Sequence, residues 1–238
     1  MSDLHVEVAA HHEAPEIVDH RQRLGIWLFI GGDVVTTGAL IFTYLYLRAV
    51  NTNGSWMSVV GLPANGRSAS TLQGILDDGG SMIKNIETPL SAGFAWLLVA
   101  VLVASVGLYW LGEVRLRSSA SGRSAFIALS VLAGIGLIAY IVLSIVQLRQ
   151  VPQYWRAEND SMLFIYSTYG SCMLALGVSA IIHAIILAFL SFGSATRAAV
   201  GVLSHEKWYQ ARLIRYFSVW VALASVVLTL VVTTLNVN

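Results

Sequence analysis

The sequence predicts an all-α integral membrane protein, a bundle of about five transmembrane helices. Hydrophobic residues make up 56% of the chain and charged residues only 11%, whereas a soluble domain carries about 25% charged residues. Five apolar runs are long enough to cross the hydrocarbon core of a bilayer, which takes roughly 20 residues. The runs lack the polar and apolar alternation of a transmembrane β-barrel, so we expect them to be helices.

The first apolar run, residues 24–47, follows a polar tail of residues 1–22. Arg23 and Arg48 flank the run, where their side chains can reach the two membrane interfaces. Asp33 lies about ten residues into it, roughly 15 Å deep at about 1.5 Å per residue. A carboxyl at that depth is tolerated only when it is protonated or faces protein, water or a lipid headgroup.

Asp33 therefore has two interpretations. In the first it marks a functional position, which is a proton site, a lipid contact or a partner contact. In the second it is a structural carboxyl that forms a hydrogen bond with a neighbouring helix.

Four further runs complete a single transmembrane domain over residues 23–238. Pro89 comes directly before the second run and suits the first turn of a helix, where its missing N–H is not needed. The fourth run is long enough to tilt in the bilayer or to project from it. The four runs cover residues 90–111, 125–148, 163–192 and 213–235.

The distribution of Lys and Arg predicts the orientation, because cytoplasmic segments are enriched in these residues. The N-terminal tail and the second and fourth connectors, with Arg215 at the membrane edge, hold most of them: Arg21, Arg23, Arg115, Arg117, Arg123, Arg197, Lys207, Arg212 and Arg215. The other side holds Arg48, Arg67, Lys84, Arg149 and Arg156. We therefore expect the N-terminus inside and the C-terminus outside.

The polar residues within the runs argue against a catalytic subunit. Membrane haem proteins usually hold haem through paired histidines, and His183 is the only histidine within a run. The chain has no nucleotide-binding loop, nucleophile elbow or zinc-ligand spacing. A net charge of +1 gives no reason to expect nucleic acid as a partner. We predict no cofactor and no metal in this chain.

Asp33 and His183 are the acidic residue and the histidine within the predicted spans. Both are expected in the middle to inner half of the membrane, but the sequence leaves open whether they meet. His183 is either a functional contact or a neutral, hydrogen-bonded core residue. Small residues in the spans, including Gly31, Gly32 and Gly38, permit close approach of helices.

Residues 23–38, RLGIWLFIGGDVVTTG, resemble a segment of haem–copper oxidase subunit III that reads roughly "lgmwLFlxsEvxfFgg". The family glutamate falls on Asp33. Residues 150–154 resemble "QxxEY", with Gln153 in place of the acid. The stretch from Tyr169 to His183 resembles "YGstFf" followed by "GfHglHv", where His183 takes the second family histidine and Ala180 replaces the first.

Other parts of the family pattern are eroded. Residues 85–90 resemble the family's approach to the next helix only weakly. The closing family motif "YWHFVDvvW" is represented by Arg215, Tyr216, Phe217 and Trp220, without its His or Asp. The number of spans is similar to that of short bacterial members of the family.

The resemblance implies a non-catalytic subunit III of a haem–copper terminal oxidase in an aerobic respiratory chain, within a bacterial plasma (inner) membrane. Such a subunit packs on the catalytic subunit, which holds the haem and copper, carries phospholipid in a cleft between helix groups, and supports proton uptake and stable turnover. The resemblance implies that Asp33 and His183 lie at this cleft. The candidate partner or packing residues are Trp27, Gly31, Gly32, Gly38, Gln150, Tyr154, Tyr169 and Gly170.

Two alternatives stay open. In the first alternative, the chain is an accessory subunit of a nitric oxide reductase. In the second, it is a small proton or ion transporter that uses Asp33. The single deep acid and the lack of an inverted repeat argue against the transporter. The electron donor of an oxidase, cytochrome c or quinol, is not indicated by the sequence.

Overall fold

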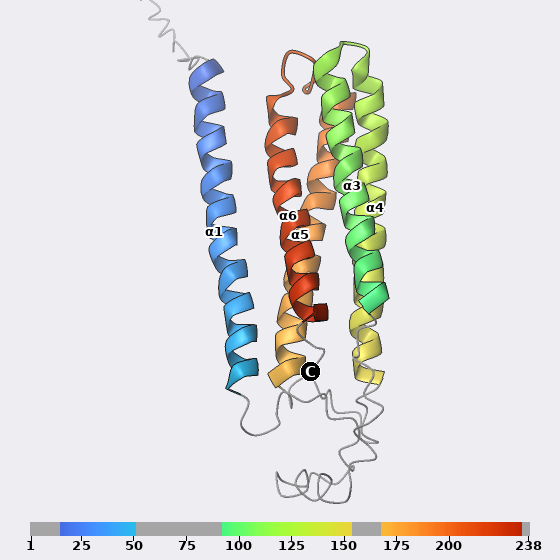
Figure 1. Cartoon of the computed structure of the whole chain (residues 1–238). Coiled ribbons are helices and arrows are strands. Elements are labelled where there is room, and N and C mark those ends of the chain that lie inside the picture. Colours follow the sequence, from blue (N-terminus) through green and yellow to red (C-terminus); the bar gives the residue numbers. More distant parts are fainter. Residues whose placement is uncertain (1–14, 51–91, 154–167, 235–238) are drawn as a thin grey trace, which may run out of the picture.

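The computed structural model describes residues 15–50, 92–153 and 168–234. This part of the chain is all-helical, and each of its five helices is long and apolar enough to cross a membrane. The prediction of an all-α chain with five helices suited to membrane spans is thereby confirmed over these residues. The helices, labelled in Figure 1, are α1 (Pro15–Ala49), α3 (Ala92–Ser118), α4 (Gly122–Gln153), α5 (Thr168–Ala199) and α6 (Tyr209–Thr234).

The helices continue past the apolar runs at their charged ends. α1 begins at Pro15 rather than near residue 24, and α3 continues to Ser118 rather than ending near residue 111. Hydropathy falls where charged residues begin, but Glu and Arg are good helix formers, so the backbone ladder continues beyond the apolar stretch. The helices therefore extend toward or past the membrane interface.

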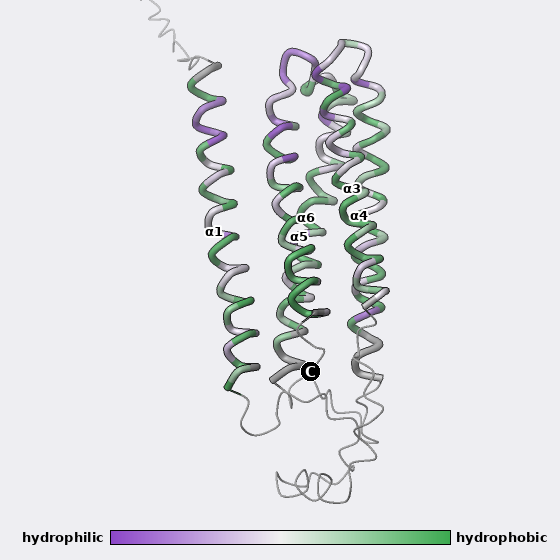
Figure 2. The backbone as a smooth tube through the Cα atoms, in the orientation of Figure 1, coloured by the Kyte–Doolittle hydropathy of each residue, from purple (hydrophilic) through white to green (hydrophobic). Residues whose placement is uncertain are grey.

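Successive helices run antiparallel, so one end of the bundle collects the start of α1, the end of α3, the start of α4, the end of α5 and the start of α6 (Figure 1). We call this the charged end, because it holds Arg21, Arg23, Arg115, Arg117, Arg123, Arg197, Lys207, Arg212 and Arg215. In Figure 2 the hydrophilic colouring concentrates at this upper end, and the helix middles are hydrophobic. We call the other end, where α4 and α6 finish, the opposite end.

A glycine and an arginine cap the C-terminal end of α5. Gly201 has φ +85°, a left-handed conformation that glycine adopts without strain. The N–H of Val202 donates to the carbonyl of Arg197 at 2.9 Å, as in a Schellman motif. The guanidinium of Arg123 donates to the carbonyls of Ala198 and Ala199, at 2.6 Å each. The charged end is therefore held together by hydrogen bonds between α4 and α5.

Three glycines let α3, α4 and α5 approach closely. A Cβ at Gly134 would lie 2.6 Å from the ring of Phe192, and one at Gly136 would lie 2.3 Å from the Ser105 hydroxyl. A Cβ at Gly177 would lie 3.0 Å from Leu148. Small residues allow tight packing of helices in lipid, where no hydrophobic driving force brings them together.

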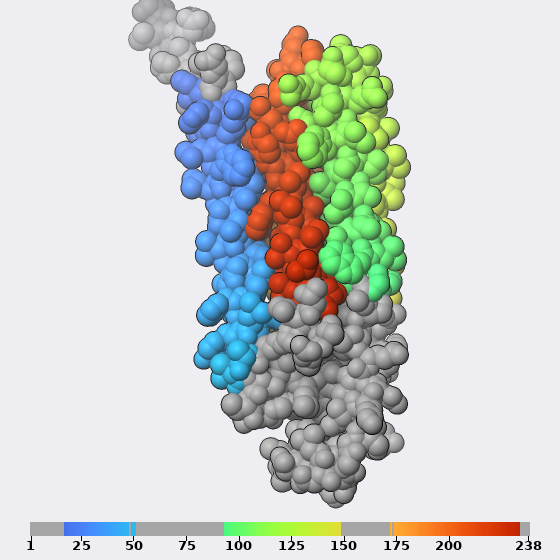
Figure 3. All heavy atoms as spheres, in the orientation of Figure 1, coloured from blue at the N-terminus to red at the C-terminus, as the bar shows by residue number. Residues whose placement is uncertain are grey.

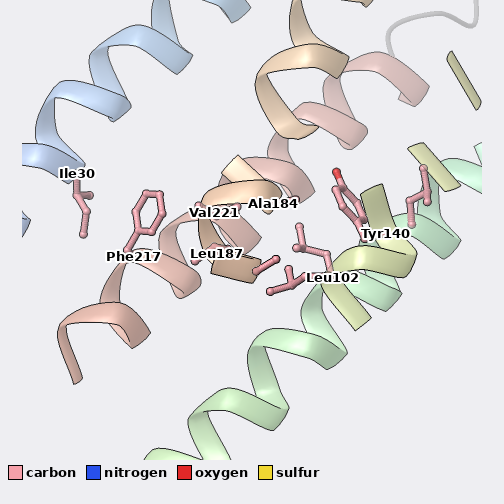
Figure 4. Close-up of a cluster of buried hydrophobic side chains, with 10 residues drawn as sticks. Ile30, Leu102, Tyr140, Ala184, Leu187, Phe217 and Val221 are labelled. Atoms are coloured by element: carbon pink, nitrogen blue, oxygen red, sulfur yellow. The ribbon is translucent and has the colours of Figure 1, made fainter. Parts of the chain in front are cut away.

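Helices α3 to α6 form a four-helix bundle that holds the main core. Helix α1 packs on this bundle mainly against α6 and α5 (Figure 3). Leu102, Leu187 and Phe217 are buried at the centre, and Ile30 joins them from α1 (Figure 4). Most of α1 is exposed, including Leu28, Val35 and Phe42. This arrangement leaves one narrow buried stripe on α1, and Asp33 lies on it.

Candidate functional site

Asp33, His183 and Trp220 meet at one site, which brings together α1, α5 and α6. Nε2 of His183 lies 2.9 Å from Oδ1 of Asp33. The indole N–H of Trp220 donates to Oδ2 of Asp33 at 2.5 Å. The structure thus brings together the two residues whose contact the sequence left open, and adds an indole that the sequence reading did not assign to a site.

Helical periodicity explains why Asp33 points inward from a helix that is otherwise exposed. Ile30, Thr37 and Tyr44 are buried, and with Asp33 they are spaced three, four and seven residues apart, so they share one face of α1. Ile30 joins the core cluster of Leu187 and Phe217, and Tyr44 packs against Leu176. Contacts on both sides of Asp33 therefore fix its carboxylate against α5 and α6.

The hydrogen bonds determine how many protons the site holds. Nδ1 of His183 is 2.7 Å from the backbone carbonyl of Ser179, which can only accept, so Nδ1 carries a proton. The contact between Nε2 and Oδ1 of Asp33 then needs one proton between them. Either the Asp33 hydroxyl donates to a neutral imidazole, or an imidazolium donates to the carboxylate.

In both arrangements the Asp33–His183 pair has no net charge. The two side chains are largely shielded, with exposures of 14% for Asp33 and 19% for His183. Because a net charge at this depth is unfavourable, a pair that shares one proton and an indole donor satisfies the site without a counter-ion. Loss of the shared proton would leave a lone pair on each of the two facing atoms and break their hydrogen bond.

The chemistry of the site fits proton storage better than metal binding. Indole nitrogen is a donor only, so Trp220 is not a metal ligand. Within the described ranges there is no group of three or more His, Cys, Asp or Glu side chains that can hold a metal ion. A cavity of about 10 Å³ beside the pair, which Thr37, Ser179 and Ala180 also line, has room for one water molecule at most.

A second buried ion pair lies toward the charged end. Nη1 of Arg215 donates to Oε2 of Glu113 at 2.9 Å, and Glu113 is fully buried. The guanidinium also lies over the rings of Trp110 (5.4 Å) and Tyr216 (5.1 Å). Glu113 follows the apolar run of residues 90–111, so the sequence predicts that it lies in a connector. This prediction is wrong, because α3 continues through Glu113 and α6 supplies its partner.

The charged end carries a third set of contacts, between the start of α1 and α6. Asp19 accepts from Arg23 at 2.7 Å and from Arg212 at 3.3 Å. The guanidinium groups of Arg212 and Arg117 lie 4.7 and 4.9 Å from the Trp208 ring centroid. These contacts attach α1 to the bundle at its first turns, above the Asp33 site.

A groove of about 310 Å³ lies between α1 and α6 on the charged-end side of Asp33. Trp27, Ile30, Trp110 and Tyr216 line it, with Arg215 among its polar groups. Trp27 is 58% exposed and stands 5.7 Å from the Tyr216 ring. Its apolar aromatic walls and single guanidinium are suited to an acyl chain with a phosphate headgroup.

The remaining predicted partner or packing residues divide into two groups. Gly31, Gly32 and Gly38 are exposed on α1, and a Cβ at any of them would meet no atom within 4 Å. They pack against none of the other helices that the structure describes. Gln150 lies in the last turns of α4, Tyr169 and Gly170 lie in the first turn of α5, and Tyr154 lies outside the described residues.

Comparison with protein-family models and with curated proteins finds no match for this chain. The geometry therefore defines the class of protein, a multi-pass α-helical membrane protein of five candidate spans with an intramembrane carboxyl–imidazole pair. Any narrower assignment depends on the motif resemblance and on the chemistry of the site.

Proposed function

We propose that the chain is a non-catalytic subunit III of a haem–copper terminal oxidase, the family whose motifs its sequence resembles. The observation that carries the proposal is the meeting of Asp33 and His183. The two residues come from separate stretches that each resemble a subunit III motif, and a chance likeness gives no reason for their motif residues to be in contact. A proton-sharing pair without cofactor ligands also suits a subunit that supports proton uptake without carrying out redox chemistry.

The catalytic subunit, which holds the haem and copper in this proposal, packs on the outward face of α1. That face combines large exposed apolar side chains, among them Leu28, Val35 and Phe42, with Gly31, Gly32 and Gly38. Exposed apolar side chains alone suit lipid equally well. The glycines favour a protein neighbour, because they let a second helix approach closely.

The groove between α1 and α6 is the proposed phospholipid site. Its walls are aromatic and aliphatic, and Arg215 supplies a donor for a phosphate oxygen. The charged end faces the cytoplasm in this proposal, following the distribution of Lys and Arg, and the membrane is the bacterial plasma membrane. The N-terminus is then inside and the C-terminus outside.

Purification of a tagged full-length chain from native membranes in mild detergent tests the proposal. We expect a haem-containing complex with a reduced-minus-oxidised spectrum of a-type or o-type haem and a catalytic subunit identified by its peptides. Metal content and turnover of O2 against NO distinguish an oxidase from a nitric oxide reductase. A chain that purifies without any haem-containing partner would contradict both assignments.

The Asp33–His183 pair also favours a second candidate function, a small proton or ion transporter. A proton shared between two side chains at mid-membrane depth is a feature of proton pathways. This function predicts proton flux by the purified chain in liposomes, abolished in Asp33→Asn. If liposomes that contain the wild-type chain are as impermeable to protons as empty liposomes, the transporter function is ruled out.

A further inference from the structure

A second cavity, of about 110 Å³, lies inside the bundle between α3, α4, α5 and α6. Apolar residues form most of its wall, including Leu98 and Leu176. Its polar lining comes from α4 and α6: Tyr140, Ser144, Gln147, Ser225, Thr229 and Thr233. None of these residues belongs to the motifs that resemble subunit III.

One polar atom in the lining is buried and has no partner among the described residues: the Nε2 amide nitrogen of Gln147, a residue that is 8% exposed. The Ser144 and Ser225 hydroxyls lie within reach of the Tyr140 hydroxyl. Buried polar groups in folded proteins are nearly always satisfied, by protein or by ordered water. The Gln147 amide therefore needs a partner that the described part of the chain does not supply.

Water fits this cavity in size and in chemistry. One water needs about 10–15 Å³ of such space and two to four polar partners, so about 110 Å³ accommodates several molecules. A hydroxyl accepts and donates, and an amide nitrogen donates, so Ser144 and Gln147 can anchor adjacent waters. The apolar wall confines those waters to the polar side of the cavity, formed by α4 and α6.

The cavity extends from the opposite end of the bundle to the middle of the membrane. Leu148 and Thr233 line it, and each is the last residue of its candidate membrane span. At the inner end, Ala180, Ser225 and Leu228 line both this cavity and the small cavity beside Asp33 and His183. The two cavities are therefore neighbours that share part of their walls.

Toward the charged end, apolar side chains pack beside the pair. Ile30, Leu187, Phe217 and Val221 form one buried cluster beside the pair (Figure 4), and the buried Glu113–Arg215 ion pair lies beyond Phe217 along α6. Among the described residues that line the two cavities, Asp33 on α1, His183 on α5 and Tyr140 on α4 are the titratable ones, and α3 and α6 supply none. The two cavities approach the pair from the opposite end, and the groove between α1 and α6 lies on its charged-end side.

We propose that this cavity is an aqueous half-channel. It holds a chain of ordered waters that connects the Asp33–His183 pair with the membrane face at which α4 and α6 end. Protons of the pair exchange with that face through the waters at Ser225, Ser144 and Gln147. This inference concerns the chain itself and holds whichever complex contains it.

Cysteine accessibility in the full-length chain tests the half-channel. In a Cys172→Ala background, Ser144→Cys and Ser225→Cys place a thiol in the cavity, and Ser191→Cys places one at a buried position, 3% exposed, outside it. The reagent is 2-aminoethyl methanethiosulfonate, which reacts with hydrated thiolates. We expect both cavity thiols to react at least tenfold faster than the control, from the face at which α4 and α6 end. Equal rates at all three positions would overturn the half-channel.

A second measurement does not depend on a buried cysteine. Ser225→Val replaces a hydroxyl with methyl groups in the wall that the two cavities share, so it should slow deuterium exchange at the His183 ring N–H at least tenfold. The indole of Trp110, which is 47% exposed, serves as the internal control and should exchange unchanged. Unaltered exchange at His183 in a variant with wild-type thermal stability would also overturn the half-channel.

Discussion

Asp33 and His183 are 150 positions apart in the chain, and yet Oδ1 and Nε2 of these residues lie 2.9 Å apart. The Ser179 carbonyl fixes the proton on Nδ1 of His183, and Trp220 donates to the second carboxylate oxygen. Every polar atom of the pair therefore has a partner, and one proton is shared between the two side chains.

Asp33→Asn should remove the titratable proton of the site and keep its hydrogen bonds. The Asn amide N–H₂ can donate to Nε2 of a neutral His183, and its oxygen can accept from Trp220. We expect the stability of the chain to change by less than about 1 kcal/mol. Within the proposed oxidase, proton uptake should slow or activity should decline faster during prolonged turnover. A variant that matches the wild type over prolonged turnover would make Asp33 a structural carboxyl.

His183→Leu should destabilise the chain, because it removes the partner of Oδ1 and leaves a half-satisfied carboxyl. The expected loss is about 1–3 kcal/mol, measured by thermal or chemical unfolding in detergent. The control is the double variant Asp33→Leu with His183→Leu, which removes both polar groups and should regain part of the loss. Strictly additive effects of Asp33→Leu and His183→Leu would argue against coupling between the two residues.

Arg215→Leu should be more destabilising than any change at an exposed ion pair. It leaves the fully buried Glu113 carboxylate without its cation, for which we expect a loss of about 3–5 kcal/mol. The matched control is Arg23→Leu, because the Arg23 side chain is 44% exposed where it pairs with Asp19 and should contribute less than about 1 kcal/mol. Similar losses in the two variants would show that burial of Glu113 does not govern the strength of its pair.

The hydropathy of the sequence predicts the five helices well, because a membrane span must be long, apolar and internally hydrogen-bonded. It predicts their charged ends poorly. Glu113 and Arg215 lie where hydropathy falls, so the reading along the chain places them in or at the edge of connectors. Their pairing arises from the packing of α3 against α6, which a one-dimensional profile does not contain.

The depth of Asp33 is readable from the sequence, but its partners are not. A span that is apolar on every side has no amphipathic stripe to mark its inward face, so the contact with His183 stays open until α1, α5 and α6 are placed. Trp220 shows the same limit, since a tryptophan in a span serves as an interface anchor or as a hydrogen-bond donor. The roles of the glycines are equally hidden in the sequence. The Phe192 ring occupies the space beside Gly134, whereas Gly38 faces outward.

Substitutions at these two kinds of glycine should therefore have opposite effects. Gly134→Leu should destabilise the chain by itself, because even a Cβ would lie 2.6 Å from the Phe192 ring, and overpacking typically costs about 1–3 kcal/mol. Gly38→Leu should leave the unfolding of the isolated chain unchanged, because nothing lies within 4 Å of its Cβ position. If a partner helix packs on this face, Gly38→Leu should reduce recovery of the haem-containing complex in the pull-down. Full recovery with Gly38→Leu and with Gly31→Leu would place lipid, rather than the catalytic subunit, against the outer face of α1.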